Sequence, residues 1–202
     1  MGNGRTIKSV AILGLCIASV TMVGGAVLAA SRGMGPKAFT TGSLELSVLP
    51  ASAAVSFNGM APGDRVTAPI RVRNDGTLPY RYSVTSTATN ADSKALAGQL
   101  DLTIKAGVTT CSDRGFAIDG TVLYGPAKLG SVAGVDVIGD PTQGFQMGDR
   151  TLDATEGEAL CLQVVLPART RNAFQGASTT ATFTFDAEQD GEAGAPTGGS
   201  AN

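Results

Sequence analysis

The sequence contains no histidine and no tryptophan among its 202 residues. A Ser/His/Asp or Cys/His catalytic arrangement needs an imidazole as its base, so the lack of histidine excludes both. It also excludes a zinc site of the HExxH type. Three cysteines are too few for zinc held by four thiolates, and no phosphate-binding loop of the GxxxxGK[ST] type occurs. We therefore expect no enzyme activity and no cofactor.

Runs of basic residues are also absent, and the formal net charge is −2. This charge pattern indicates that nucleic acid is not a partner. The remaining candidate ligands are scattered carboxylates, for which calcium would be the natural metal. The stretch DRTLDATEGE (Asp149–Glu158) comes nearest to such a loop, but it lacks the DxDxDG pattern. A glycosidase would need two facing carboxylates and a cleft with aromatic walls, and only three tyrosines are present. We interpret the acids as solvated loop residues.

The first 30 residues have the pattern of an export signal. Arg5 and Lys8 are followed by an apolar run, Val10–Leu28, which ends in the small residues of VLAAS (residues 27–31). This pattern predicts a signal peptide over 1–30, cut after Ala29 or Ala30. The run is also long enough to span a bilayer, so a retained membrane anchor is the alternative. Export machinery and signal peptidase are then expected partners, and the protein is expected to be secreted or held at the cell surface.

Export changes how the three cysteines are interpreted. Cys16 lies inside the apolar run, which leaves Cys111 and Cys161 in the exported chain. An even number of cysteines in an oxidising compartment predicts a disulfide between them, and two free thiols are the alternative.

Alternation of apolar and polar residues dominates the middle of the chain. Leu160, Leu162 and Val164 share one face of a predicted strand, and Ala181, Phe183, Phe185 and Ala187 share one face of another. Helix signals are scarce, with one or two turns expected within Ala91–Leu100. Many short strands between Gly and Pro turns predict an all-β antiparallel sandwich over 38–189. A flexible linker at 31–37 and a disordered acidic, Gly-rich tail at 190–202 would flank it. Residues 116–157 are expected to hold one or two short strands.

Two turn motifs frame the predicted strand Arg65–Arg73. Pro62 and Gly63 suit the central positions of a type II turn, and Asp64 would accept backbone hydrogen bonds beside it. Asn74, Asp75 and Gly76 are typical of a tight hairpin, which would pair this strand with Leu78–Val84. The acids of both motifs are therefore interpreted as turn residues and not as a catalytic or metal site.

Several segments, taken in order, carry a resemblance to a known family: FTTGSLELSV (39–48), FNGMAPGD (57–64), IRVRNDGTLPYRY (70–82), LDLTI (100–104) and FQGASTTATFTFDAEQ (174–189). The chain resembles the TasA/camelysin family of exported bacterial proteins. The resemblance implies a jelly-roll-like sandwich that is secreted or surface-held, with members that form biofilm matrix fibres. The family also carries a metallo-endopeptidase label, for which this sequence offers no histidine. Its cysteine pair, its acidic tail and its single aromatic near the mature start, Phe39, depart from the fibre-forming members.

We therefore expect a structural protein of the matrix or cell surface that associates with itself or with related matrix subunits. The alternating segment Ala38–Leu49 would add to a neighbour's sheet, with Leu44, Leu46 and Val48 on one face setting the register. The alternatives are a monomeric surface adhesion or accessory module and a peptidase of the labelled kind.

Overall fold

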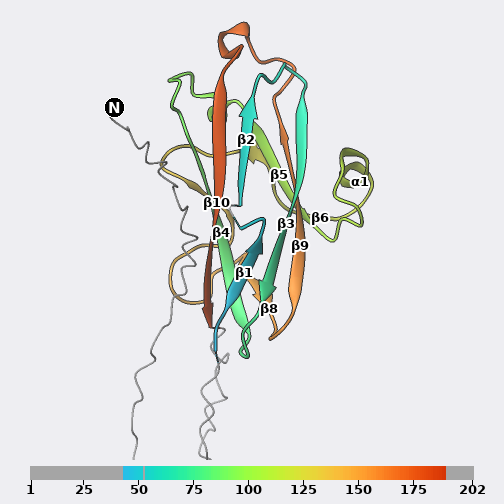
Figure 1. Ribbon diagram of the computed structural model, residues 1–202, viewed down its shortest axis with the longest axis vertical. Coiled ribbons are helices and arrows are strands. Elements are labelled where there is room, and N and C mark those ends of the chain that lie inside the picture. The colour runs from blue at the N-terminus through green and yellow to red at the C-terminus, as the bar shows by residue number, and fades with distance from the viewer. Residues whose placement is uncertain (1–42, 52, 190–202) are drawn as a thin grey trace, which may run out of the picture. The chain divides into compact units, whose positions relative to one another are not determined.

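The computed structural model describes residues 43–51 and 53–189 (Figure 1). The chain divides into Met1–Phe39 and Thr40–Asn202, and every described residue belongs to the second unit. The expectations for the signal peptide, the linker, the tail and residues 38–42 of the sandwich lie outside the described residues. Within the described ranges, no helix is long and apolar enough to cross a membrane.

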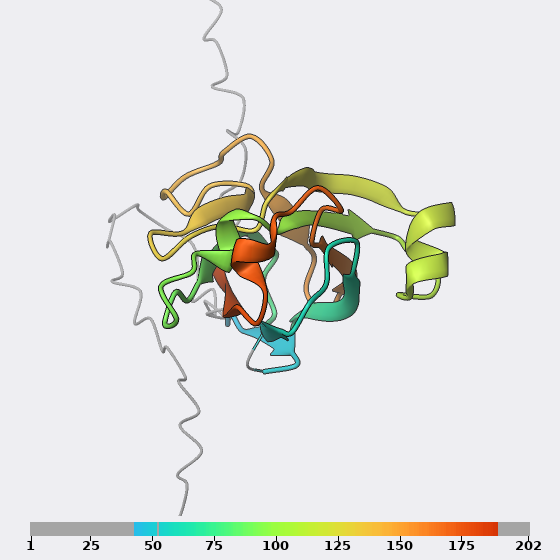
Figure 2. The ribbon, with the colours of Figure 1, turned by 90° about the horizontal axis from the view of Figure 1, so that it is seen from above.

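The described residues form two antiparallel sheets, which lie as two layers (Figure 2). Sheet A contains, from edge to edge, β1 (Leu46–Leu49), β3 (Arg65–Asn74), β9 (Gly157–Val165), β5 (Asp101–Ala106) and β6 (Thr121–Lys128). Sheet B contains, in the same manner, β2 (Ala54–Asn58), β10 (Ser178–Gln189), β4 (Tyr80–Ala88) and β7 (Val135–Ile138), with β8 (Arg150–Leu152) also paired to β4. The predicted all-β sandwich is confirmed.

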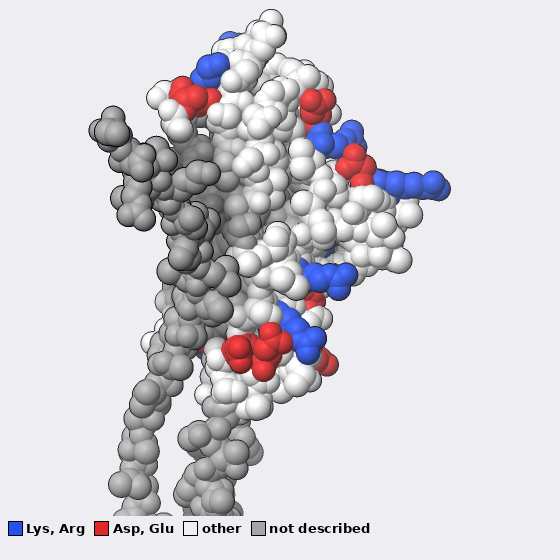
Figure 3. All heavy atoms as spheres, in the orientation of Figure 1, with Lys and Arg blue, Asp and Glu red and all other residues white. Residues whose placement is uncertain are grey.

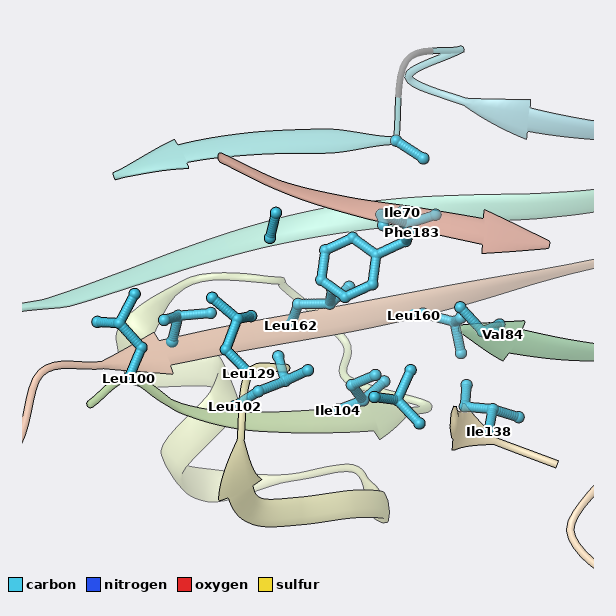
Figure 4. Packing of buried hydrophobic residues seen from close by; sticks show 14 of the residues in the cluster. Ile70, Val84, Leu100, Leu102, Ile104, Leu129, Ile138, Leu160, Leu162 and Phe183 are labelled. Atoms are coloured by element: carbon cyan, nitrogen blue, oxygen red, sulfur yellow. The ribbon is translucent and has the colours of Figure 1, made fainter. Parts of the chain in front are cut away.

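The core lies between the two sheets and follows the alternation of the sequence. On β9, Leu160, Leu162 and Val164 are at most 3 % exposed, and they face the interior because every second side chain of a strand points the same way. Figure 4 shows these side chains from both sheets packed against each other, among them Ile70, Val84, Leu102, Ile104, Leu160, Leu162 and Phe183. Burial of this apolar surface is the main force that holds the layers together.

Helices are few and short: η1 (Leu96–Gly98), α1 (Asp113–Ile118) and η2 (Asn172–Phe174). The helical turn expected within Ala91–Leu100 is the single 3-10 turn η1. Residues 116–157 contain β6, β7 and β8, one strand more than expected. The sequence pattern did not predict β6, because this half-exposed edge strand contains Gly125 and Pro126 and its alternation of apolar and polar residues is weak.

The predicted hairpin between Arg65–Arg73 and Leu78–Val84 is wrong, because β3 belongs to sheet A and β4 to sheet B. The connection crosses from one layer to the other and is organised by Asn74, whose side chain is fully buried. Its Nδ2 donates to the carbonyl oxygens of Leu78 (2.8 Å) and Leu152 (3.1 Å), and its Oδ1 accepts from the N–H of Gly76 (3.0 Å). The Asn-Asp-Gly motif therefore makes a sheet-to-sheet turn.

A connection between β5 and β6, residues 107–120, lies against part of the outer face of sheet A and contains α1, which projects from the sheets (Figure 1). Cys111 in this connection forms a disulfide with Cys161, which lies on β9 between two core-facing leucines and so points outward. Asp113 accepts a hydrogen bond from the Thr67 hydroxyl of β3. Lys105 of β5 donates to the carbonyl oxygens of Phe116 (2.7 Å) and Asp119 (3.1 Å). We call this segment the sheet A cover.

A second connection, residues 139–149 between β7 and β8, lies over the outer face of sheet B. It is held by Asp149, whose side chain is 3 % exposed and accepts from the N–H groups of Asp140 (3.1 Å) and Gln146 (2.9 Å). Arg81 of β4 lies beneath, with its Nε 2.7 Å from Glu188 of β10 and 3.7 Å from Asp149. Glu188 also accepts from the N–H of Gly144 (2.9 Å). We call this segment the sheet B cover.

Candidate functional site

One stretch of β10 has no described neighbour on one side. β2 pairs with β10 over Ser178–Thr182, and the last backbone bond on that side runs from the N–H of Phe183 to the carbonyl of Ala53 (2.9 Å). β10 continues to Gln189, and among the described strands none pairs with residues 184–189 on the β2 side. We call residues 184–189 the open edge of β10.

The backbone of the open edge is oriented to receive another strand. N–H and C=O groups of successive residues in an antiparallel strand point to alternate sides. Because the N–H of Phe183 points toward β2, those of Phe185, Ala187 and Gln189 point to the same side, while the even-numbered residues face β4. An extended segment from another chain would find these donors and acceptors in a regular row.

Partly buried apolar side chains lie on the open edge itself and on β1 of the other sheet. Phe185 and Ala187 of β10 and Leu46 and Val48 of β1 pack against the core without being fully covered. The Phe185 ring lies 6.1 Å from the ring of Tyr82, centroid to centroid. An added strand with apolar residues on its inner face would bury more of this surface, at roughly 25 cal/mol for each Å² removed from water.

The strand predicted to be donated, with Leu44, Leu46 and Val48 on one face, is divided in the structure. Leu46 and Val48 lie on β1, which pairs with β3 of the same chain from Leu46–Asn74 to Leu49–Arg71. Leu44 precedes β1 and is 37 % exposed. On the side of β1 that faces away from β3, none of the described strands pairs with it. Donation of this segment to another chain stays a prediction.

β3 has a second uncovered half-edge, but a proline interrupts it. β1 covers only Arg71–Asn74, so residues 65–70 have no described partner on that side. The N–H of Asp75 donates to the Glu45 carbonyl on the β1 side, and by alternation an N–H at position 69 would point the same way. Pro69 has no N–H, which weakens this half-edge as a template for another strand. The open edge of β10 contains no proline.

The turn residues singled out from the sequence all have backbone roles. Gly63 has φ of +98°, and its N–H donates to the Leu166 carbonyl (2.7 Å). Asp64 accepts a hydrogen bond from the N–H of Ala61 (2.8 Å) and Pro62 completes the turn. Asp75 accepts from the Ser47 side chain and from Arg73, and these two bonds lower the pKa of its carboxyl. None of these acids faces a second carboxylate across a cleft.

The most concentrated set of polar groups links the two sheets below the core. The Tyr82 hydroxyl of β4 donates to Glu158 of β9 (2.5 Å), and Arg150 of β8 forms an ion pair with the same carboxylate. Burial, and then the nearby Glu158 carboxylate, raise the pKa of Tyr82, so the phenol stays protonated and donates. Both oxygens of Glu158 are thus occupied by partners of its own chain, and the set acts as a structural link.

One protein family, described as Camelysin metallo-endopeptidase, has a sequence model that matches residues 7–193. The chain belongs to this family. None of the curated proteins matches it. The match extends over nearly the whole chain, so the camelysin family assignment covers both the β-sandwich and most of the segment that precedes it.

The name of the camelysin family implies a catalytic metal, and the residues present do not fit one. Protein zinc sites of this kind take at least three ligands from histidine, cysteine and carboxylate, and the sequence has no histidine. Within the described residues, no three side chains of these types gather closely enough to hold an ion. Cys111 and Cys161 are bound to each other. The side chains of the described residues therefore do not fit the metal that the family name implies.

Proposed function

We propose that the protein is an exported structural subunit that self-associates by strand addition at the open edge of β10. The single observation that carries the proposal is the row of backbone groups at residues 184–189 that no described strand pairs with on the β2 side, next to half-buried apolar side chains. A free, regular edge of this kind is a template for another chain unless it is blocked. The sequence resemblance to the TasA/camelysin family, some members of which form matrix fibres, supports the same direction, and the camelysin family match covers both ends of the sandwich.

The donor in this proposal is Ala38–Leu49 of a neighbouring subunit. Its alternating residues Leu44, Leu46 and Val48 would face inward and cover Phe185 and Ala187, while its backbone pairs with the open edge. Within its own chain the described part of this segment pairs with β3 over Leu46–Leu49, and the carbonyls of Ser43 and Glu45 accept backbone N–H groups of the β3–β4 connection. Edge strands open at a lower free energy than central strands, so in this proposal the segment leaves its own chain and exchanges between subunits.

A proline on the acceptor side tests the proposal without removing the core. Ala187→Pro deletes one N–H that points to the open side and leaves the ladder between β10 and β4 in place, as Pro69 does on β3. We expect the variant to stay folded and to lose polymers by light scattering and electron microscopy. Ala187→Ser, which keeps the N–H, is the matched control and should polymerise as the unaltered protein does.

The donor is tested by deleting Ala38–Leu49, which should abolish polymers while the rest of the sandwich still folds. Addition of a synthetic peptide of this sequence to the deletion variant should then give a one-to-one complex that Ala187→Pro prevents. Polymers that form equally well with the deletion or with Ala187→Pro would show that strand addition at this edge is wrong. A strictly monomeric protein at high concentration would favour the surface adhesion module instead.

A further inference from the structure

A small concave pocket at one end of the sandwich is lined by cations and by no acid. It lies where the loop after β9, orange in Figure 1, meets the ends of β5 and β6, and its volume is about 190 Å³. The lining residues are Gln99, Lys128, Pro167, Arg169, Thr170, Arg171 and Phe174. On the face shown in Figure 3, acidic and basic side chains instead lie in small mixed groups. The pocket therefore brings three bases together in a chain whose net charge is −2. We call it the basic pocket.

Two of the three cations in the basic pocket have no carboxylate partner among the described residues. Lys128 forms an ion pair with Asp101 (Nζ to Oδ1, 2.7 Å). Arg169 and Arg171 are exposed, and no described acid pairs with either. Their guanidinium groups are therefore free to take carboxylates from outside the chain, in the bidentate geometry that arginine favours.

The opposite end of the sandwich carries exposed acidic side chains instead of basic ones. The turn Asp153–Glu156 stands directly before β9, and the N–H of Glu156 donates to the Asp153 carbonyl (3.1 Å). Both side chains are exposed and unpaired within the described residues, and Glu45 lies exposed beside them across the β3–β4 turn. The nearby bases Arg73 and Arg150 are already paired, with Asp75 and Glu158. We call Glu45, Asp153 and Glu156 the acidic end.

The acidic end and the basic pocket lie at the two ends of β9. Asp153–Glu156 directly precedes the first residue of this strand, and Arg169 follows shortly after its last. A strand of nine residues is roughly 30 Å long. Translating one copy along this strand by about the length of the sandwich therefore brings its acidic end onto the basic pocket of the next. Such a contact uses two different surfaces and repeats without closing, which generates a filament.

We propose that the basic pocket of one copy binds the acidic end of a second copy, so that subunits stack end to end. This inference rests on the proposed self-association and adds its direction and its dependence on salt. Ser43, the first described residue, is hydrogen-bonded to Thr77 beside the acidic end. The chain thus enters the sandwich at the acidic end.

Charge reversal on each side tests the contact with the full exported protein. Arg169→Glu with Arg171→Glu makes both ends acidic, and Asp153→Lys with Glu156→Lys makes both ends basic. Each double variant alone should associate at least about tenfold more weakly than the unaltered protein, by analytical ultracentrifugation at about 0.02 M salt. An equal mixture of the two should recover association, because opposite ends meet again. Arg114→Glu, an exposed arginine on α1, is the control and should change nothing.

Salt and the acceptor proline separate this proposal from strand addition. Raising the salt to about 0.5 M should weaken the association of the unaltered protein and should not weaken that of the reversed variants, because salt screens the repulsion between their like-charged ends. If Ala187→Pro prevents association while both charge reversals behave as the unaltered protein, strand addition stands and the end-to-end contact is overturned. Failure of the mixture to recover also overturns it, provided both variants keep the unaltered circular dichroism spectrum. An unaltered protein that remains monomeric at every salt concentration overturns both proposals.

Discussion

The outer faces of the two sheets are both covered by a long connection, but different chemistry holds each cover. The sheet A cover is fastened covalently, by Cys111 to Cys161 of the central strand β9. The sheet B cover has no such bond among its described residues and is held by Asp149 and Glu188, which accept backbone N–H groups around the buried Arg81. Both covers lack regular β-sheet hydrogen bonding, so other contacts must hold them in place and satisfy their backbone N–H and C=O groups.

The two covers should respond to opposite perturbations. A disulfide is insensitive to salt and to mild acid and is broken by reducing agents. A carboxylate network is insensitive to reducing agents, and its strength depends on the charge of its acids. Disulfides persist in oxidising compartments, so the proposed export of the protein would preserve the bond that holds the sheet A cover. The comparison is useful because each cover serves as the internal control for changes made to the other.

Removing the disulfide should have the largest effect. The double variant Cys111→Ser with Cys161→Ser opens a loop that spans a sequence separation of 50 residues. In the chain-entropy model this lowers the free energy of unfolding by about 4 kcal/mol. Urea unfolding measures the loss, and hydrogen exchange should rise in residues 107–120 while residues 139–149 stay protected. Equal exchange in both covers would show that they are not independent.

Removing Asp149 should have the next largest effect, confined to the other face. Asp149→Ala leaves the N–H groups of Asp140 and Gln146 without their acceptor and takes one carboxylate from the buried Arg81. Breaking a buried charged network of this kind costs about 3 kcal/mol. Asp136→Ala is the control, because Asp136 is exposed and accepts only from the Thr85 hydroxyl. Loss of protection in residues 107–120 instead would contradict the assignment of Asp149 to the sheet B cover.

The alternation of apolar and polar residues predicted the two layers of the sandwich, but it did not predict the two covers or the open edge of β10. Leu160, Leu162 and Val164 predict a half-buried strand, because the two-residue repeat of apolar side chains can be recognised within one short segment. Where a neighbouring strand ends is not local, so Phe185 looks the same whether or not β2 extends beside it. The pairing of Cys111 with Cys161 followed from compartment and count, and the alternation on β9 places Cys161 on the outer face, yet nothing local shows that a connection lies over it there. Asp149 looked like any solvated loop acid, because its burial depends on Arg81, 68 positions away in the chain.

The same reasoning explains the wrong hairpin. Asn74, Asp75 and Gly76 carry the residue types of a tight two-strand turn, and that signal is local. The buried side chain of Asn74 instead reaches Leu152, which is distant in sequence, and the chain changes sheet there. A local motif could not distinguish the two outcomes, because the deciding hydrogen bond is long-range.

A methyl group at position 139 should have a smaller effect than removal of Asp149. Gly139 has φ of +57°, and a Cβ built there would lie 2.3 Å from Oδ1 of Asp149 and 2.9 Å from its Cα. Gly139→Ala therefore adds a backbone clash to the strain of the left-handed conformation, and should lower the free energy of unfolding by about 2 kcal/mol. Gly176→Ala is the control, since its φ of +65° is similar to that of Gly139 and the space around it is open. If both variants lose the same stability, the conformation alone matters and the close approach to Asp149 does not.

Acid should have the smallest effect, and only on the sheet B cover. Hydrogen bonds from the Thr142 hydroxyl and then from the Thr142 N–H (2.7 Å) hold the pKa of Asp140 below its ordinary value of 3.8. Because the folded pKa is the lower one, the stabilisation is complete above pH 3.8 and is lost as the pH falls through the folded value. Hydrogen exchange, corrected for its intrinsic pH dependence, should therefore rise in residues 139–149 between about pH 4 and about pH 2, while residues 107–120 stay protected by the disulfide. Asp140→Asn should reduce that rise, because its amide does not titrate in this range. An equal rise in both covers would show that acid acts on the whole sandwich and that the chemical difference between the covers is without consequence.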